Sequence, residues 1–274
     1  MTVEAFFLPA AAAGQRFCLF YPPEAGIPTR GAVVYVHPFA EEMNKSRRMA
    51  ALQARALALA GYAVLQIDLH GCGDSSGDFG DATWENWIED VRLACDWLQQ
   101  RSDAALWLWG LRTGCLLASA AASRVGRPNK LLLWQPVVSG KQFLQQFLRL
   151  KLAGEMLGGE GKGLMERLRQ QLAQGESVEV AGYLLSAGLA NGLEQAELVP
   201  AAQSSRIAWI ELSGKPDGRL SPLADARIEQ WRSAGLAAQG SLVCGPAFWQ
   251  TAEITECPAL LDASILAMAE AGAA

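Results

Sequence analysis

Two glycines, Gly110 and Gly114, separate a strongly apolar run from a helical one, and this short turn constrains the fold more than any other feature. Residues 106–109 are typical of a buried strand, and residues 115–124 have the composition of a buried helix. A strand that passes through two glycines directly into a helix matches the Gly-x-Ser-x-Gly turn, which raises a strained central residue above a parallel sheet. The sequence therefore predicts such a sheet, with Arg112 where a serine is usual.

Arg112 cannot do the chemistry of that serine, because a guanidinium stays protonated and cannot attack a carbonyl. A serine nucleophile also needs a histidine base, which comes last of the three catalytic residues along a chain with this turn. This chain has only His37 and His70, and both precede the turn. The sequence thus favours the fold and argues against the chemistry usually run on it.

The rest of the chain alternates between β-rich and helical patterns, which is typical of an α/β protein with a mostly parallel central sheet flanked by helices. The predicted strands cover 5–10, 16–21, 32–36, 62–69, 106–109, 130–134, 207–212 and 241–244. The predicted helices cover 47–60, 83–100, 115–124, 222–233 and a last segment from Pro258 onward. We expect one domain over residues 1–274.

One segment interrupts this alternation. Residues 139–203 are rich in helical patterns and too long for an ordinary connection between two elements. We expect a helical lid insertion here, in which the amphipathic stretch 143–150 covers the carboxyl edge of the sheet.

Composition argues against several classes of function. The net charge is −5, and the densest basic cluster is only Lys45, Arg47 and Arg48, so nucleic-acid binding lacks electrostatic support. The six cysteines are scattered without metal-ligand spacing, which is typical of reduced thiols in a cytoplasmic protein. The apolar stretch 104–123 is better explained as a buried strand and helix than as a membrane span. We expect no metal, no cofactor and no stable membrane insertion.

Three motifs carry a resemblance to a known superfamily. The run that starts at His37-Pro38-Phe39 resembles an oxyanion loop, and residues 68–77 are similar to an Asp-x-x-Gly-x-Gly-x-Ser-x-Gly turn. With the turn at Arg112, they resemble the α/β-hydrolase superfamily over essentially the whole chain, which implies the α/β-hydrolase fold.

A narrower resemblance rests on longer matches. The combination of Met-Asn-Lys-Ser-Arg-Arg, Gly-Cys-Gly-Asp-Ser-Ser-Gly-Asp-Phe and Trp-Gly-Leu-Arg resembles the exosortase A system-associated hydrolase 2 family. That resemblance implies a setting in bacterial exosortase and exopolysaccharide systems and a hydrolase label, but it establishes no reaction.

Three further residues are candidates for catalysis. Ser75 is the centre of a second literal Gly-x-Ser-x-Gly match, but the chain continues to Thr83 before a helix begins, so we interpret Ser75 as a turn residue. His37 is interpreted as shaping the oxyanion loop and not as the base. Asp217 follows a late strand where the superfamily carries its triad acid, and it is either a remnant of that acid or an ordinary turn aspartate.

Arg112 opens a helix, where free backbone N–H groups attract anions, so its own charge needs compensation. One hypothesis is an internal salt bridge that closes an old active site, with the candidate partners Glu41, Glu42, Asp217 and Glu253. The other hypothesis is a pocket for a carboxylate or phosphate, with the ligand-binding candidates Arg112, His37, Phe39 and Thr113. Where the superfamily's histidine would follow the last strand, Phe248 and Trp249 offer an aromatic pair that fills the space.

Three functions stay open. The first is a pseudoenzyme, non-catalytic or weakly catalytic, that binds a small anionic or acyl ligand or a protein partner in exosortase-linked physiology. The second is an active serine-type esterase, thioesterase or peptidase-like hydrolase with a different nucleophile. The third is a structural partner of another enzyme.

Overall fold

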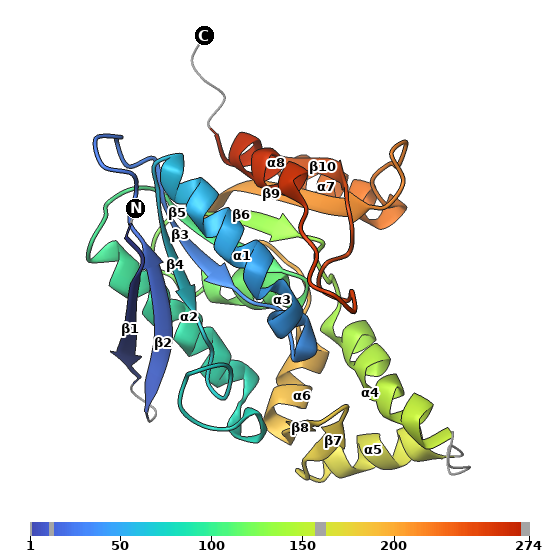
Figure 1. Ribbon diagram of the computed structural model, residues 1–274. Helices are drawn as coiled ribbons and strands as arrows, with labels where there is room; N and C mark the ends of the chain where they lie inside the picture. Colours follow the sequence, from blue (N-terminus) through green and yellow to red (C-terminus); the bar gives the residue numbers. More distant parts are fainter. Residues whose placement is uncertain (1, 11–13, 157–162, 270–274) are drawn as a thin grey trace.

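The central feature of the fold is one sheet with the strand order β1-β2-β4-β3-β5-β6-β9-β10 (Figure 1). The computed structural model describes residues 2–10, 14–156 and 163–269. Strands from β4 to β10 pair in parallel, and the β1–β2 hairpin adds two antiparallel strands at one edge. The bounds are β1 Glu4–Pro9, β2 Gln15–Tyr21, β3 Gly31–Val36, β4 Tyr62–Ile67, β5 Leu106–Leu111, β6 Asn129–Trp134, β9 Ser204–Ser213 and β10 Ala238–Cys244.

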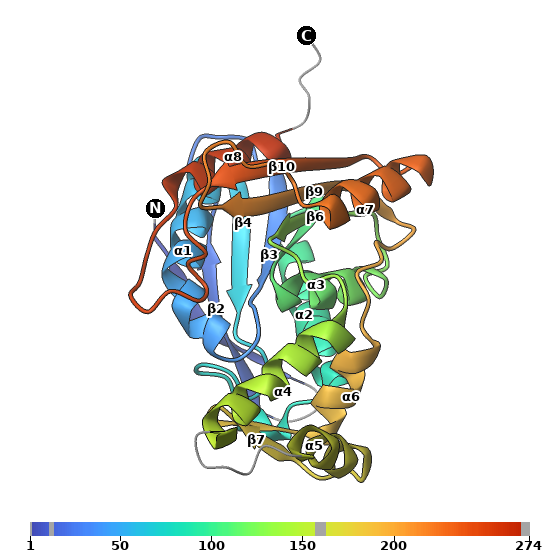
Figure 2. The ribbon, with the colours of Figure 1, turned by 90° about the vertical axis from the view of Figure 1, so that its right-hand side faces the viewer.

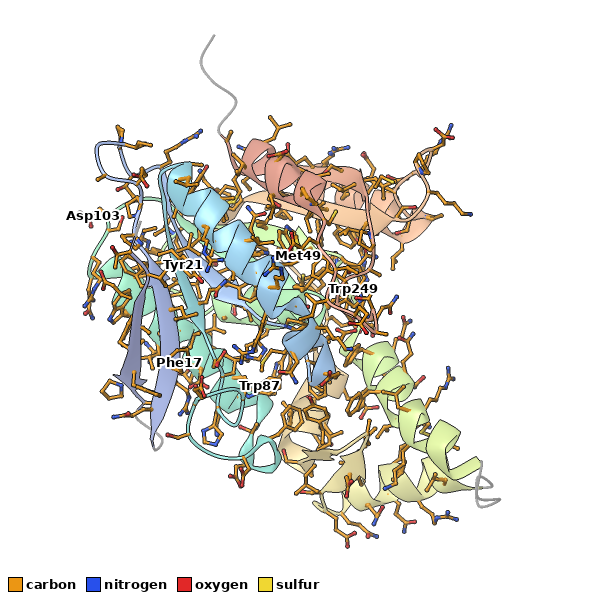
Figure 3. The ribbon with its side chains drawn as sticks, in the orientation of Figure 1. Phe17, Tyr21, Met49, Trp87, Asp103 and Trp249 are labelled. Atoms are coloured by element: carbon orange, nitrogen blue, oxygen red, sulfur yellow. The ribbon has the colours of Figure 1, made fainter. Side chains whose placement is uncertain are left out.

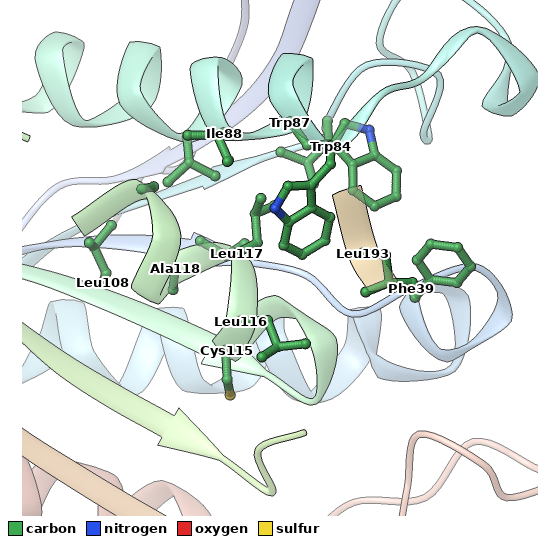
Figure 4. Close-up of a cluster of buried hydrophobic side chains, with 14 of the residues drawn as sticks. Phe39, Trp84, Trp87, Ile88, Leu108, Cys115, Leu116, Leu117, Ala118 and Leu193 are labelled. Carbon is green, nitrogen blue, oxygen red and sulfur yellow. The ribbon is translucent and has the colours of Figure 1, made fainter. Parts of the chain in front are cut away.

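Helices cover both faces of this sheet, as the parallel strands require. On one face lie α1 (Glu41–Leu59) and α8 (Pro258–Met268), and on the other lie α2 (Trp84–Gln99), α3 (Thr113–Ala122) and α7 (Pro222–Ser233). A short 3₁₀ turn, Phe79–Asp81, precedes α2. Figure 4 shows the α2–α3 side of the core, where Trp84 and Trp87 pack near Leu117 of α3. The predicted α/β-hydrolase architecture is confirmed.

The connection from β6 to β9 forms a substructure of its own, gathered below the sheet in Figure 2. It contains α4 (Gly140–Met156), α5 (Leu164–Ala173), β7 (Val178–Val180), β8 (Tyr183–Leu185) and α6 (Ala187–Gln195). Its two ends lie side by side: Gly140 N donates to Ala196 O at 2.8 Å, and Leu198 N donates to Val138 O at 2.9 Å. This insertion therefore begins and ends at one place beside the sheet.

The insertion contacts the sheet's carboxyl edge through α4. The rings of Phe143 and Phe147 lie 5.6 and 5.1 Å from the ring of Phe39, which follows β3 directly. These contacts place the amphipathic stretch 143–150 against the loop that leaves β3.

Several element bounds differ from those predicted, including those of α1, β4 and β10. Helix α1 begins at Glu41, six residues before the predicted start, because Ala40 at φ 50° turns the chain without a capping side chain. Strand β4 ends at Ile67 and β10 begins at Ala238. The insertion also contains the β7–β8 hairpin, where helical sequence was expected. Of these differences, the earlier start of α1 matters most, because it brings Glu42 into the first turn of the helix.

Within the three described ranges, no helix combines the length and apolar character needed to cross a membrane.

Candidate functional site

The turn between β5 and α3 holds Arg112 in a strained backbone conformation, with φ 55° and ψ −119°. A non-glycine residue is uncommon at positive φ and persists only where its surroundings enforce it. Here Arg112 N donates to Trp134 O at 3.0 Å, and Arg112 O accepts from Cys115 N at 3.1 Å and from Val137 N at 3.2 Å. Strand β6 and the loop after it therefore fix the turn from the side.

The flanking glycines allow the close packing that this turn needs. A Cβ at Gly110 would lie 2.6 Å from Cys115 Cα, and one at Gly114 would lie 2.2 Å from Val36 O. Neither distance is compatible with a side chain, so α3 can approach β3 and β5 only because both positions lack one. The elbow geometry predicted from the sequence is present, with Arg112 at its centre.

The charge of Arg112 is compensated from within the chain. Its Nε and Nη2 atoms both donate to Glu42 Oε1 at 3.3 Å, and both side chains are 20% exposed. Burial raises the pKa of Glu42, and the neighbouring Arg112 guanidinium opposes that rise. Of the four acidic candidates, Glu42 is therefore the ion-pair partner.

An aromatic ring covers Arg112 from another side. Trp249 is buried in the segment between β10 and α8 (Figure 3). Its ring centroid lies 5.5 Å from Arg112 Cζ. Phe248 supports it, with the two ring centroids 5.2 Å apart. The segment is tied to α1 by Lys45, whose Nζ donates to Ala252 O at 3.0 Å. We call Glu42, Arg112 and Trp249 the plug, because Glu42 and Trp249 each contact the guanidinium of Arg112 at the elbow.

His37 is a buried, fully engaged residue. Its Nδ1 lies 2.8 Å from Pro38 O, and its Nε2 lies 3.3 Å from Leu69 N. A backbone amide can only donate, so Nε2 accepts and Nδ1 carries the proton. Burial lowers the pKa of this imidazole, which keeps it neutral. His37 thus links the loop after β3 to the loop after β4.

Phe39 and Thr113, the other ligand-binding candidates, are also buried. Phe39 belongs to an aromatic cluster with Phe79, Trp87, Phe143 and Phe147. Thr113 is the first residue of α3 and follows Arg112 directly.

Ser75 is part of a rigid turn. Its Oγ donates to Asp68 O at 2.5 Å and accepts from Phe17 N at 2.9 Å. His70 points its Nδ1 at Arg16 Nη2, 2.9 Å away. In the part of the chain that the structure describes, no serine is hydrogen-bonded to either histidine.

A buried ion pair that sequence reasoning missed lies beside this turn. Arg16 Nε is 2.7 Å from Asp90 Oδ1, and the two side chains are 1% and 4% exposed. Asp90 Oδ2 also accepts from His70 N at 2.7 Å. The pair joins β2, α2 and the loop after β4, which are too far apart in the sequence for any local pattern to reveal it.

The late acidic residues serve different purposes. Asp217 is exposed in the turn after β9. Glu211, near the end of β9, is buried and accepts from both the backbone N and the Oγ of Ser221 at 2.7 Å, which fixes the start of α7. Among the described residues, no group of three or more His, Cys, Asp or Glu side chains is placed to hold a metal ion.

The sheet, the elbow and the flanking helices define a protein of the α/β-hydrolase fold. The family model of the S33 serine aminopeptidases matches residues 27–174, which is more than half of the chain. The chain therefore belongs to the serine aminopeptidase S33 family. No curated protein sequence matches it.

Solved structures from other organisms have the same fold. Est1E from Butyrivibrio proteoclasticus, in its complex with ferulic acid, is 14% identical with a TM-score of 0.68, and the match covers 96% of this chain and 97% of that one. A soluble variant of monoglyceride lipase from Saccharomyces cerevisiae is 13% identical with a TM-score of 0.62, over 98% and 96% of the two chains. An α/β serine hydrolase without a lid from Xanthomonas campestris is 14% identical with a TM-score of 0.60, over 96% and 91%. At these identities the likeness concerns the fold alone.

Proposed function

We propose that this chain is a non-catalytic member of its family, a pseudoenzyme that binds a ligand or a protein partner. The plug carries the proposal. A working elbow presents a nucleophile to substrate and keeps a base within hydrogen-bond reach. Here the elbow presents a guanidinium, which pairs with Glu42 and lies 5.5 Å from the centroid of the Trp249 ring.

The plug also bears on how the protein binds. With Glu42 3.3 Å away, the positive charge of Arg112 already has its counter-ion. An outside carboxylate or phosphate would have to displace Glu42 and would leave that buried carboxylate unpaired, at substantial cost. The plugged arrangement therefore favours binding elsewhere on the molecule over an anion pocket at the elbow.

Two further parts of the proposal rest on other observations. Motifs that resemble the exosortase A system-associated hydrolase 2 family support a role in bacterial exosortase and exopolysaccharide systems. The packing of α4 on Phe39 supports the insertion at residues 139–203 as a lid over the carboxyl edge of the sheet.

The test is labelling with a fluorophosphonate, which reacts with activated serines, together with turnover of short-chain and long-chain esters. We expect no labelled serine in the wild type and none in Arg112→Ser, because the base is also missing. Turnover should stay far below the range of about 1–10³ per second that is common for enzymes. Slow hydrolysis would not contradict the proposal, since an enzyme stripped of its triad can still accelerate a reaction by about 10³–10⁴-fold.

Stoichiometric labelling of one serine in the wild type, with ester turnover in the enzyme range that disappears when that serine becomes alanine, would show a working hydrolase and end the proposal.

A further inference from the structure

The two edges of the central sheet differ in how they are protected from further pairing. At one edge, β1 carries Glu4 at its start and Pro9 at its end. At the other edge, β10 is a strand without a charged residue or a proline, and in the described ranges it pairs only with β9 (Figure 2). Charged side chains and prolines are common means of keeping an edge strand from pairing with another chain. The β10 edge has neither.

The register of β10 against β9 shows which backbone groups face outward. At the start of the strand, Ile207 N donates to Ala237 O at 2.9 Å. At its end, Gly245 N donates to Ser213 O at 2.9 Å. Alternate residues of a strand turn their N–H and C=O groups to opposite sides. The odd-numbered residues of β10 therefore bond to β9, and the even-numbered residues face away from the sheet.

Both ends of this outward-facing side already have partners. Ala238 N donates to Leu236 O at 2.9 Å, and Ala238 O accepts from Arg232 Nε at 2.8 Å. At the other end, Cys257 Sγ lies 3.9 Å from Cys244 O. Pairing with another strand is therefore limited to the residues between these two ends.

The open part of the edge is short and symmetric. Across the described ranges, the N–H and C=O groups of Gly240 and Leu242 have no hydrogen-bond partner, and both residues are partly exposed. These four groups lie on either side of Ser241. In an antiparallel pair, every second pair of opposed residues exchanges two hydrogen bonds. A second copy of β10, related by a two-fold axis at Ser241, places its Leu242 opposite Gly240 and satisfies all four groups on each chain.

The surface beside this edge suits the same arrangement. Between β10 and α8 lies a hollow of about 200 Å³, whose lining includes Gly240, Ser241, Ala263 and Leu266. Leu266 is 77% exposed, more than any other large apolar side chain of the described residues. The two-fold axis places α8 of both copies on one face of the joined sheet. It therefore brings Leu266 of each copy to the β10 edge of the other and removes it from water.

We propose that the β10 edge joins two copies of this chain into a two-fold dimer with one continuous sheet. The partner is a second copy because the open groups are complementary to themselves about Ser241, which is the property that a two-fold contact requires. The proposal is independent of the proposed function, since none of the three plug residues belongs to β10 or α8.

Sedimentation velocity of the complete chain over a concentration series measures the dimer. We expect a dissociation constant on the order of 10 µM, because a contact through one strand and one helix is small. Leu242→Pro removes an outward N–H without touching the ladder to β9, and with it two of the four hydrogen bonds across the axis. It should weaken the dimer by about tenfold or more. Phe7→Lys, on the opposite edge strand, is the matched control and should leave the dimer unchanged, as should Arg112→Ala.

Cross-linking tests the register directly and does not depend on the proline variant. In the proposed pairing the two Ser241 residues oppose each other without hydrogen bonds, at a Cα separation of about 4.5 Å, which a disulfide can span. The background is Cys244→Ser, because Cys244 is exposed whereas the other five cysteines are buried. In that background, oxidation with diamide should cross-link two copies through Ser241→Cys. Gln239→Cys lies two residues from the axis and should not cross-link.

Several outcomes would overturn the proposal. The complete chain could stay monomeric throughout the concentration series, or its dimer could persist undiminished in folded Leu242→Pro. Equal cross-linking of Gln239→Cys and Ser241→Cys would contradict the register. Deletion of residues 270–274 adds a further control: a dimer that forms only after this deletion would mean that the end of the chain, and not a second copy, covers the β10 edge.

Discussion

The turns at residues 110–114 and 73–77 share a pattern of flanking glycines but hold their central residues in different ways. In the first turn the chain passes directly from β5 into α3, and Arg112 is forced to a φ of 55°. After the second turn the chain passes through a 3₁₀ turn before α2 begins. The Ser75 hydroxyl donates one hydrogen bond to the backbone and accepts another from it. One turn has the geometry for catalysis without the residue, and the other has the residue without the geometry.

This contrast shows that the geometry of the elbow depends on how α3 packs against the sheet and not on a catalytic residue at its centre. Gly110 and Gly114 let α3 lie against β3 and β5 whatever side chain stands between them. The serine turn, in contrast, is maintained by polar contacts, because Arg16 and Asp90 are buried beside it. The two turns should therefore fail under different kinds of substitution.

The largest effect is expected at the ion pair beside the serine turn. Asp90→Asn removes the buried carboxylate that pairs with Arg16, which costs about 3–5 kcal/mol of the free energy of unfolding. Urea unfolding measures the loss. Glu89→Gln, on the same helix, is the matched control, because Glu89 pairs with Arg92 at the surface and should cost about 1 kcal/mol or less. Equal losses in the two variants would refute the polar account of this turn.

A smaller loss is expected from the elbow. Gly114→Ala places a methyl group against the carbonyl oxygens of Val36 and His37, and overpacking of this kind costs about 1–3 kcal/mol. Gly214→Ala is the control, since a Cβ there meets no atom within 4 Å and should change stability by about 0.5 kcal/mol at most. Thermal or urea unfolding of both variants decides the point, and a neutral Gly114→Ala would show that the glycine is not needed for packing.

Ser75→Ala should lower stability without changing activity. The variant leaves the Phe17 amide without its acceptor, which costs about 1–2 kcal/mol in unfolding experiments. Fluorophosphonate labelling and ester turnover should equal those of the wild type. A variant of unchanged stability that loses a measurable esterase activity would make Ser75 a nucleophile and reverse our interpretation of both turns.

The smallest effect concerns pH at the plug. Burial raises the folded-state pKa of Glu42 above its unfolded value of about 4.3. The stability that this group contributes is therefore present below about pH 4 and is lost as pH rises through the folded pKa. Relative to Glu42→Gln, the wild type should lose stability as pH rises through that window.

Arg112 supplies the control for this pH effect. In an Arg112→Ala background the opposing influence of the guanidinium is gone, so the same loss should extend to higher pH. Denaturant unfolding at several pH values, with all four combinations of the two substitutions, gives the comparison. Identical slopes in the two backgrounds would mean that Arg112 and Glu42 are not coupled.

The sequence predicted the parts of this molecule that depend on local patterns. Runs of apolar residues located β3, β5, β6 and α3. The lack of a serine at the elbow and of any histidine after His70 can be read directly from the sequence. The start of α1 was missed because Ala40 lacks a capping side chain. The β7–β8 hairpin was missed because its tight turn places Ala181, with φ 50°, before Gly182, and alanine is not a signal for positive φ.

The long-range contacts could not be predicted in the same way. Four acidic residues were equal candidates for Arg112, and only the fold selects Glu42, 70 residues away in the sequence. Arg16 and Asp90 are 74 residues apart and belong to different secondary structures. Such pairs depend on how elements are arranged in space, which periodicity does not encode.

The insertion between β6 and β9 has a consequence for how this fold can change over evolutionary time. Its first and last residues are joined by an isolated antiparallel bridge between Ser139 and Glu197, flanked by the hydrogen bonds from Gly140 N to Ala196 O and from Leu198 N to Val138 O. The register of β6 against β9 is therefore set on the sheet side of this closure, independently of the length of the segment beyond it. Variation in the length of the segment between Gly140 and Ala196 therefore leaves this register unchanged, while Phe143 and Phe147 hold α4 against Phe39.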